Sequence, residues 1–208
     1  MLAVDLVDPT IAGIVEDVWQ HGWSVCPGFL TPQESALLAA ECERSWRDGE
    51  FRQAGVGIGE ELRVDRTVRR DYVHWMAETA LTPAQHSYWL RLDALRQTLN
   101  RELTLGLFSY EGHLTVYPPG AFYRKHLDQF QRVAYRQVSC ILYLNQDWQE
   151  DDGGQLRIYL DEAGQERWVD VAPRGGTLVV FMSARFWHEV LPARRERMSW
   201  TGWFRRRE

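Results

Sequence analysis

The sequence predicts an α+β fold that is mainly β, with helices in the first half and a β-sandwich or jelly roll in the second. In the first half, apolar residues recur at helical intervals and two Thr-Pro pairs mark helix starts. From residue 108 onward, short runs rich in β-branched and aromatic residues are separated by Pro, Gly, Asn and Asp at roughly 8–12 residue intervals. This spacing is typical of a sandwich or jelly roll and not of alternating strand–helix–strand units.

The chain has the size and composition of one globular domain. It contains 208 residues, of which 45% are hydrophobic and 25% are charged. We expect residues 1–208 to form a single domain in which the helices of residues 1–107 cover the edges of the β-rich part at 108–208.

The helices of the first half follow from apolar spacing and caps. One helix is expected over residues 9–22, ending at a glycine, and the strand WSVCPGFL follows it. Two more helices are expected from Pro32 to about Arg47 and from Pro83 to about Leu105, each after a capping threonine. The residues expected to face the core are Ile11, Ile14, Val15, Val18 and Trp19, then Leu37, Leu38 and Cys42, then Trp89, Leu92, Leu95 and Leu99.

The remaining elements are one long loop and a series of strands. Residues 48–66 contain four glycines and mixed charges, which predicts a loop long enough to be functional. The segment RRDYVHWM then predicts a strand. The strands expected in the second half are HLTVYPPG, RQVSCILYLN, GQLRIYL, RWVDVAP, GTLVVFM, FWHEV and MSWTGWF.

Composition also excludes several classes of protein. The net charge of −5 argues against a general nucleic-acid binder. Cys26, Cys42 and Cys140 form no CxxC pair, so we expect neither a disulfide framework nor a structural zinc site, and a reducing compartment fits. The N-terminus MLAVDLVDPT lacks the basic segment of a signal peptide, and no window approaches 18 uncharged apolar residues. We therefore expect a soluble, cytoplasmic protein with no nucleic-acid or membrane partner.

The stretch YRKHLDQF carries a histidine and an aspartate two residues apart, which share one face of a strand. His126 and Asp128 could be surface residues, a catalytic pair or two metal ligands. His188 offers a second imidazole, and Arg197 follows nine residues after it. Two imidazoles and one carboxylate form a facial triad for Fe(II), which leaves positions open for a bidentate cosubstrate and dioxygen. The planar guanidinium of Arg197 can bind a distal carboxylate through two hydrogen bonds.

The motifs around these residues resemble those of the 2-oxoglutarate/Fe(II) dioxygenases. Within that superfamily the chain is most similar to the prolyl 4-hydroxylases of the oxygen-sensing type, which act on hypoxia-inducible factor, and to their bacterial relatives. The resemblance covers roughly residues 55–205 and rests on YxxHxD, YLNxDW, GGxLRI, HEVxP and RxxxTxWF. It implies a double-stranded β-helix core, which is a jelly roll of the cupin type, with N-terminal supporting helices.

The resemblance implies a role for each matching residue. His126, Asp128 and His188 would bind Fe(II), and Arg197 would bind the 5-carboxylate of 2-oxoglutarate. The residues implied around that cosubstrate are Tyr143, Thr201, Leu156 and Val190. The residues implied at the substrate side are Tyr117, Tyr123, Arg136, Trp203 and Asp71, together with a substrate-binding loop at about 48–71.

Two further expectations concern the substrate. Asp71 is expected to order the loop through an arginine such as Arg136. The chain ends at Glu208, so the long C-terminal helix that helps the animal enzymes hold substrate is expected to be missing. His21, His74, His86 and His113 are expected to be ordinary residues and not metal ligands.

The activity implied is hydroxylation of a proline in an intracellular protein, with the translation factor EF-Tu as a candidate. The products would be 4-hydroxyproline, succinate and CO2, and the cofactors would be Fe(II), 2-oxoglutarate and O2, with ascorbate as a stimulant. A small-molecule or peptide hydroxylase and a catalytically inactive binding module are the alternatives. A nucleic-acid demethylase fits less well, because RMSWTGW departs from the RxNxTxR pattern of that branch.

Overall fold

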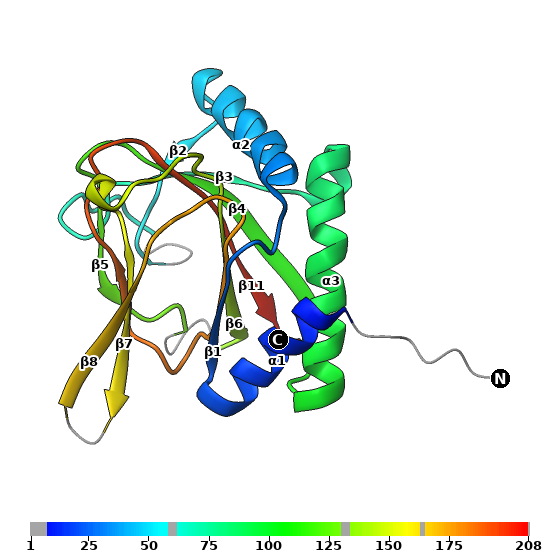
Figure 1. Cartoon of the computed structure of the whole chain (residues 1–208). Coiled ribbons are helices and arrows are strands. Elements are labelled where there is room, and N and C mark those ends of the chain that lie inside the picture. Colours follow the sequence, from blue (N-terminus) through cyan, green and yellow to red (C-terminus); the bar gives the residue numbers. More distant parts are fainter. Residues whose placement is uncertain (1–7, 58–61, 130–133, 163–164, 208) are drawn as a thin grey trace.

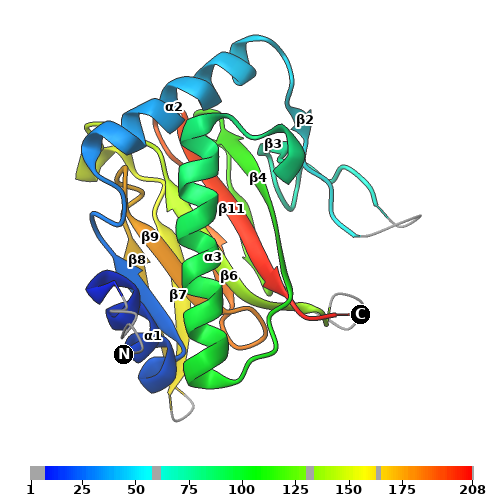
Figure 2. The same cartoon turned by 90° about the vertical axis from the view of Figure 1, so that its right-hand side faces the viewer.

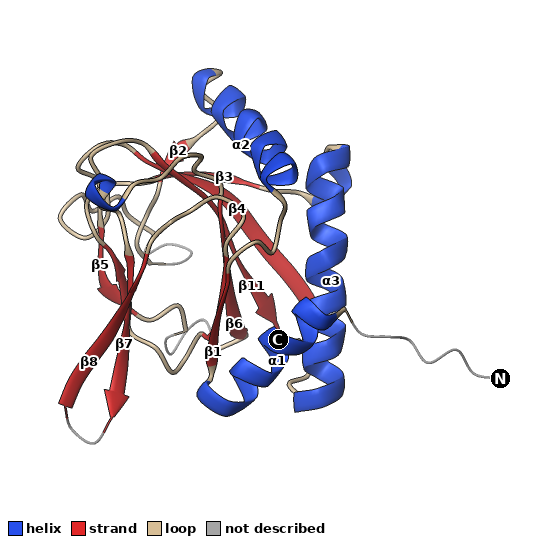
Figure 3. Cartoon of the chain, in the orientation of Figure 1, coloured by secondary structure: helices blue, strands red, loops and turns tan. Residues whose placement is uncertain are grey.

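Two antiparallel sheets face each other, and the helices lie against the outer face of the larger sheet (Figures 1 and 2). The computed structural model describes residues 8–57, 62–129, 134–162 and 165–207. Figure 3 shows that the strands make up the body of the molecule and that the helices stand on one side of it. The predicted α+β, mainly β jelly-roll fold is therefore confirmed.

The helices begin and end close to the predicted residues because their caps are encoded locally. Thr31 and Glu34 form a capping box, as do Thr82 and Gln85. Gly22 ends the first helix with a φ of 84°, a conformation that glycine adopts without strain. The helices are α1 (Pro9–His21), α2 (Pro32–Arg47) and α3 (Pro83–Leu103), with short 3₁₀ turns at Glu78–Ala80 and Glu150–Asp152.

Three of the predicted core positions were wrong or only partly right. Trp19 is 67% exposed and Leu37 is 60% exposed, while Trp89 is partly buried. Successive residues of a helix are about 100° apart, so Leu37 turns away from the face that buries Leu38. In α3 the buried aromatic residue is Tyr88, the neighbour of the predicted Trp89. None of the described helices is long and apolar enough to cross a membrane.

The larger sheet has the strand order β1-β9-β6-β11-β4-β3-β2, and the smaller sheet has the order β5-β10-β7-β8. The two long strands of the larger sheet, β4 and β11, run antiparallel. They pair Tyr117 with Arg197 at one end and Ser109 with Arg205 at the other. The strands are β1 (Trp23–Cys26), β2 (Arg52–Gln53), β3 (Tyr72–Trp75), β4 (Ser109–Tyr117), β5 (Tyr123–His126), β6 (Arg136–Tyr143), β7 (Leu156–Glu162), β8 (Gln165–Val171), β9 (Leu178–Met182), β10 (His188–Val190) and β11 (Arg197–Arg205).

Alternation along the strands separates two cores. On β11, Trp200 and Phe204 belong to the core that lies against the helices. Thr201 and Trp203, which alternate with them, face the smaller sheet, where a second apolar cluster includes Ile158 and Phe181. Of the predicted loop at about 48–71, residues 58–61 lie outside the described part, and the remainder contains the two-residue strand β2.

Candidate active site

Almost all of the predicted site residues line one cavity between the two sheets. Thr201 and Trp203 reach it from β11, and His188 and Val190 reach it from β10. Only Tyr143 and Asp71 of the predicted residues do not line it. The lining residues are Arg69, His113, Thr115, Tyr117, Tyr123, His126, Leu127, Asp128, Arg136, Ile141, Leu156, His188, Val190, Arg197, Thr201 and Trp203.

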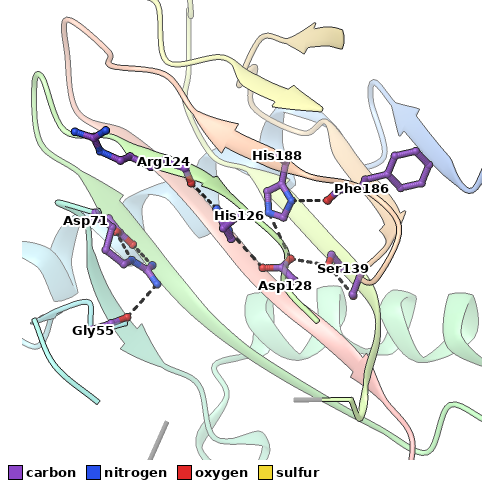
Figure 4. A network of polar contacts seen from close by, with 10 residues as sticks. Gly55, Asp71, Arg124, His126, Asp128, Ser139, Phe186 and His188 are labelled. Atoms are coloured by element: carbon purple, nitrogen blue, oxygen red, sulfur yellow. Dashed lines mark hydrogen bonds and ion pairs between the residues drawn. The ribbon is translucent and has the colours of Figure 1, made fainter. Parts of the chain in front are cut away.

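Strand pairing brings the three predicted metal ligands together. His126, the last residue of β5, is the cross-strand partner of His188, the first residue of β10. Asp128 lies two residues after the end of β5, and its carboxylate oxygens lie 3.6 Å from Nε2 of each histidine. Figure 4 shows the three side chains pointing toward one another. One ligand atom from each residue lies within 4.8 Å of the others, so the three can hold one metal ion.

The main chain fixes the orientation of both imidazoles. His126 Nδ1 lies 2.7 Å from the carbonyl oxygen of Arg124, and His188 Nδ1 lies 3.1 Å from that of Phe186. A carbonyl oxygen can only accept, so each Nδ1 carries the proton and donates it. When such a ring is neutral, Nε2 keeps its lone pair and is free to bind a metal ion.

The charge states of the ligands also suit a cation. Burial lowers the pKa of His188 to about 4, so the ring is neutral at pH 7. Burial raises the pKa of the Asp128 carboxyl, but His188, His126 and the Ser139 hydroxyl outweigh burial and hold that pKa well below its usual range. Two imidazoles and one carboxylate with no thiolate form a donor set suited to Fe(II).

Arg197 and Tyr143 form a second site on the wall of the larger sheet. Arg197 is 1% exposed and Tyr143 is fully buried, and the guanidinium carbon lies 5.1 Å from the centre of the tyrosine ring. Nε of Arg197 donates to the carbonyl oxygen of Gly154 at 2.8 Å. Within the described residues, Nη2 of Arg197 and the hydroxyl of Tyr143 have no hydrogen-bond partner.

This pair of unpartnered donors fits the distal carboxylate of 2-oxoglutarate. A buried guanidinium is stable only when an anion or several acceptors neutralise it. No ion pair of Arg197 with a carboxylate is found in the described ranges, which leaves Nη2 available to the carboxylate of a bound ligand. Burial raises the pKa of Tyr143 to about 12, against the opposing charge of Arg197, and the hydroxyl therefore stays protonated and can donate.

Apolar side chains form the remaining walls near this pair. Leu156 is fully buried and Val190 is 7% exposed, and both are predicted cosubstrate contacts on the smaller sheet. Thr201 faces them from the larger sheet, paired with His113 on one side and Ile141 on the other. A carboxylate held among these residues would be shielded from water, which strengthens its ion pair with Arg197.

Aromatic rings and one arginine surround the outer part of the cavity. Tyr123 stacks on the imidazole of His126, with ring centres 3.6 Å apart. The guanidinium of Arg136 lies 3.7 Å above the ring of Trp203 and donates to Glu111 at 2.7 Å. Tyr117 lies deeper, 5.0 Å from the Arg197 guanidinium carbon, and is 4% exposed.

Asp71 pairs with an arginine, as predicted, but that arginine is Arg69 and not Arg136. Its carboxylate forms a buried ion pair with Arg69, whose Nε donates to Oδ1 at 2.7 Å. Arg69 also donates to the carbonyl oxygen of Gly55 and lies 4.1 Å above the ring of Tyr123 (Figure 4 shows Asp71 and Gly55). Arg136, on β6, forms an ion pair with Glu111, on β4 of the same sheet. Asp71 thus contacts the loop through Arg69.

Several cavity residues were missed by the sequence interpretation. His113 and Thr115 line the cavity; His113 was expected not to be a metal ligand, and among the described residues it lies outside the group of three metal-ligand candidates. They lie four and two residues before Tyr117 on β4, so the period of two along a strand could have placed them on the same face. Ser139 was also missed, and its hydroxyl donates to Oδ2 of Asp128 at 2.6 Å.

Comparison with known proteins agrees with this site. The model of the 2OG-Fe(II) oxygenase superfamily matches residues 112–205. A prolyl-4-hydroxylase from Pseudomonas putida is 45% identical, with a TM-score of 0.85, and the match covers 95% of this chain and 100% of that chain. A prolyl hydroxylase from Trichoplax adhaerens, solved with a peptide fragment of the oxygen degradation domain of hypoxia inducible factor, is 25% identical, with a TM-score of 0.82 and coverages of 94% and 88%.

A longer relative is also similar. The hypoxia-inducible factor prolyl hydroxylase of Caenorhabditis elegans is 27% identical over 203 residues, which cover 92% of this chain. The chain spans 27% of the length of that relative. The matches to the superfamily model and to the bacterial structure together confirm the resemblance seen in the motifs. The chain belongs to the 2OG-Fe(II) oxygenase superfamily and, within it, to the prolyl-hydroxylase branch.

Proposed function

We propose that the chain is a Fe(II)- and 2-oxoglutarate-dependent prolyl 4-hydroxylase that acts on a proline of an intracellular protein. One observation carries this proposal. Arg197 has an unpartnered donor and lines the same cavity as His126, Asp128 and His188, and the unpartnered hydroxyl of Tyr143 belongs to the ring that lies directly beside Arg197. A metal triad and a separate carboxylate anchor are the two sites that this chemistry requires.

Each group of residues has one task in the proposed reaction. His126, Asp128 and His188 would bind the metal, while Arg197 and Tyr143 would hold the distal carboxylate of the cosubstrate. When bound, Fe(II) with 2-oxoglutarate and O2 supplies the oxidising power that converts a C–H bond to C–OH, with release of succinate and CO2. The apolar walls exclude water, and the protein places C4 of the target proline within reach of the metal.

The outer part of the cavity supports a protein substrate. Tyr123 and Trp203 place aromatic rings at the outer part of the cavity, where their edges can contact a proline ring, and Arg136 can donate to the carbonyl groups of a peptide. Arg69 lines the cavity and bonds both Asp71 and the carbonyl oxygen of Gly55, so it holds the loop at about 48–71 beside the cavity. There the loop can contact an extended chain. The Trichoplax relative was solved with a peptide fragment, which supports the same class of substrate here.

EF-Tu is the first protein to test as the substrate, and the cytoplasm is the proposed location. The three cysteines are free, and two of them are buried, which fits a reducing compartment. Stimulation by ascorbate and a role in oxygen sensing are further proposals that rest on the similarity to the oxygen-sensing enzymes.

The test is turnover with purified protein, Fe(II) and 2-oxoglutarate. Succinate release is measured with a cell extract and with purified EF-Tu, and proline residues that gain one oxygen atom are located by mass spectrometry. Asp128→Ala serves as the control, because it keeps both histidines and removes the only carboxylate of the triad. We expect one hydroxylated proline that disappears in the control.

Each alternative function gives a different result. Oxidation of free proline or of a small peptide, with no modified protein, would favour a small-molecule hydroxylase. A folded protein that releases no succinate with any extract would refute an enzymatic function and favour a binding module. Hydroxylation of a protein other than EF-Tu would support the activity and refute only that substrate.

A further inference from the structure

Asp128 differs from the other two metal-ligand candidates in how its orientation is fixed. Both histidines are held by main-chain carbonyl oxygens, from Arg124 and Phe186, which side-chain substitution leaves in place. The carboxylate is held instead by a side chain, because the hydroxyl of Ser139 donates to Oδ2 at 2.6 Å. A single substitution at position 139 therefore tests how the carboxylate ligand is controlled.

Ser139 does not act alone, because its oxygen lies 2.8 Å from the hydroxyl oxygen of Ser183. A serine hydroxyl has one proton, and a charged carboxylate can only accept. The proton of Ser139 is therefore used in the bond to Asp128, and Ser183 must be the donor in the bond between the two serines. The hydrogen bonds run in one direction, from Ser183 to Ser139 to Asp128, and bonds aligned in this way strengthen one another.

The two serines are held rigidly. Both are fully buried. Ser139 lies in the middle of β6, paired with Phe181 on one side and Trp203 on the other. Ser183 directly follows β9, and its main chain donates to the carbonyl oxygen of Gln137 at 3.0 Å and accepts from the amide of Gln129 at 3.3 Å. The second of these bonds attaches Ser183 to the residue after Asp128.

We infer that Ser139 and Ser183 are positioning residues for the metal, and that they act by fixing the Asp128 carboxylate. An Asp side chain has two rotatable bonds, and a strong hydrogen bond to one oxygen removes most of that freedom before the ion arrives. Outer hydrogen-bond partners of metal ligands typically change metal affinity by roughly 10–100-fold when they are removed. This inference rests on the metal site of the proposed function.

The test measures metal binding directly and does not depend on turnover. The dissociation constant of Mn(II) is measured by titration calorimetry for wild type, Ser139→Ala, Ser183→Ala and the double variant. The visible absorption of bound Co(II) reports the ligand geometry. Ser24→Ala is the matched control, because Ser24 is also buried and donates to a carboxylate, that of Asp17, at 2.7 Å.

We expect Ser139→Ala to weaken Mn(II) binding by roughly 10–100-fold and to alter the Co(II) spectrum, while Ser24→Ala changes neither. Ser183→Ala should have a smaller effect, and none once Ser139 is alanine, because Ser183 acts only through Ser139. Thermal melts of the metal-free variants establish that each is folded. If Ser139→Ala does not fold, Ser183→Ala still tests the chain of bonds through its own Mn(II) affinity.

Two results would overturn the inference. Mn(II) affinity of Ser139→Ala within about twofold of wild type would refute the positioning role, since outer partners that matter change affinity by at least tenfold. Additive losses from the two substitutions would refute the directed chain of bonds. A wild-type protein that fails to bind Mn(II) would instead refute the metal site and with it the proposed function.

Discussion

Replacing Tyr143 with phenylalanine should stabilise the free protein while weakening its affinity for 2-oxoglutarate. The Tyr143 hydroxyl is buried and has no hydrogen-bond partner among the described residues. The substitution removes this one oxygen atom and keeps the ring. The two effects have opposite signs because the hydroxyl lacks a partner until the cosubstrate carboxylate arrives.

The magnitudes follow from the cost of an unpaired polar group and the strength of a charged hydrogen bond. An unpaired buried hydroxyl costs about 1–3 kcal/mol, so Tyr143→Phe should raise the free energy of unfolding by up to that amount. In a chain of this size, each kcal/mol corresponds to roughly 2–4 °C in Tm. A hydrogen bond to a carboxylate contributes about 1.5–3 kcal/mol, so the KM for 2-oxoglutarate should rise roughly 10–150-fold.

The assay combines a thermal melt of the free protein with succinate release at varied 2-oxoglutarate. Tyr88→Phe is the control, because the Tyr88 hydroxyl is also buried and unpartnered within the described residues but belongs to α3, away from the cavity. This control should leave the KM unchanged. A lower Tm in Tyr143→Phe would show that the hydroxyl already has a partner in the free protein. An unchanged KM would refute its role in cosubstrate binding.

Three other predictions concern cosubstrate binding, the charge of a buried histidine and a buried ion pair. Arg197→Lys keeps the charge but loses the planar fork, so the KM for 2-oxoglutarate should rise roughly 10–100-fold while Mn(II) affinity stays within about threefold; equal losses of both would refute the assignment. Burial lowers the pKa of His113 to about 3 from its ordinary 6.5, so the unfolded chain binds the extra proton and stability falls as pH falls between these values. Between about pH 7.5 and pH 5, wild type should lose about 2 kcal/mol more than His113→Gln in urea denaturation, and parallel losses would contradict a neutral buried ring. Asp71→Asn leaves Arg69 buried and unpaired, and should lower the free energy of unfolding by about 3–5 kcal/mol, which Arg69→Met should partly restore; a loss below about 1 kcal/mol would contradict the buried ion pair.

Features encoded by neighbouring residues could be predicted from the sequence. The capping boxes at Thr31 and Thr82 fixed the helix starts, and the alternation of β-branched and aromatic residues located the strands. The ligands His126, Asp128 and His188 were predicted because their motifs are specific, and the structure places them around one point. These elements depend on local propensity and short-range hydrogen bonds, which the chain displays directly.

Contacts between distant segments could not be predicted in the same way. Whether Asp71 pairs with Arg69 or with Arg136 depends on how β3, β4 and β6 lie in the larger sheet, and Glu111 competes for Arg136. Whether Leu37 faces solvent or the core depends on how α2 packs against that sheet. His113 was missed because no motif marks it, although the strand period places it on the inner face.

The strand β10 has only three residues, yet it lies between β5 and β7 and connects the two ends of the smaller sheet. His188 at its start and His126 on β5 face each other across this short pairing. An ion bound by both would cross-link the strands where few backbone hydrogen bonds hold them. Metal binding would therefore stabilise the pairing of β5 with β10, since a ligand that binds only the paired form stabilises it. Loss of the ion would lower the local stability of this sheet as well as remove the reaction centre.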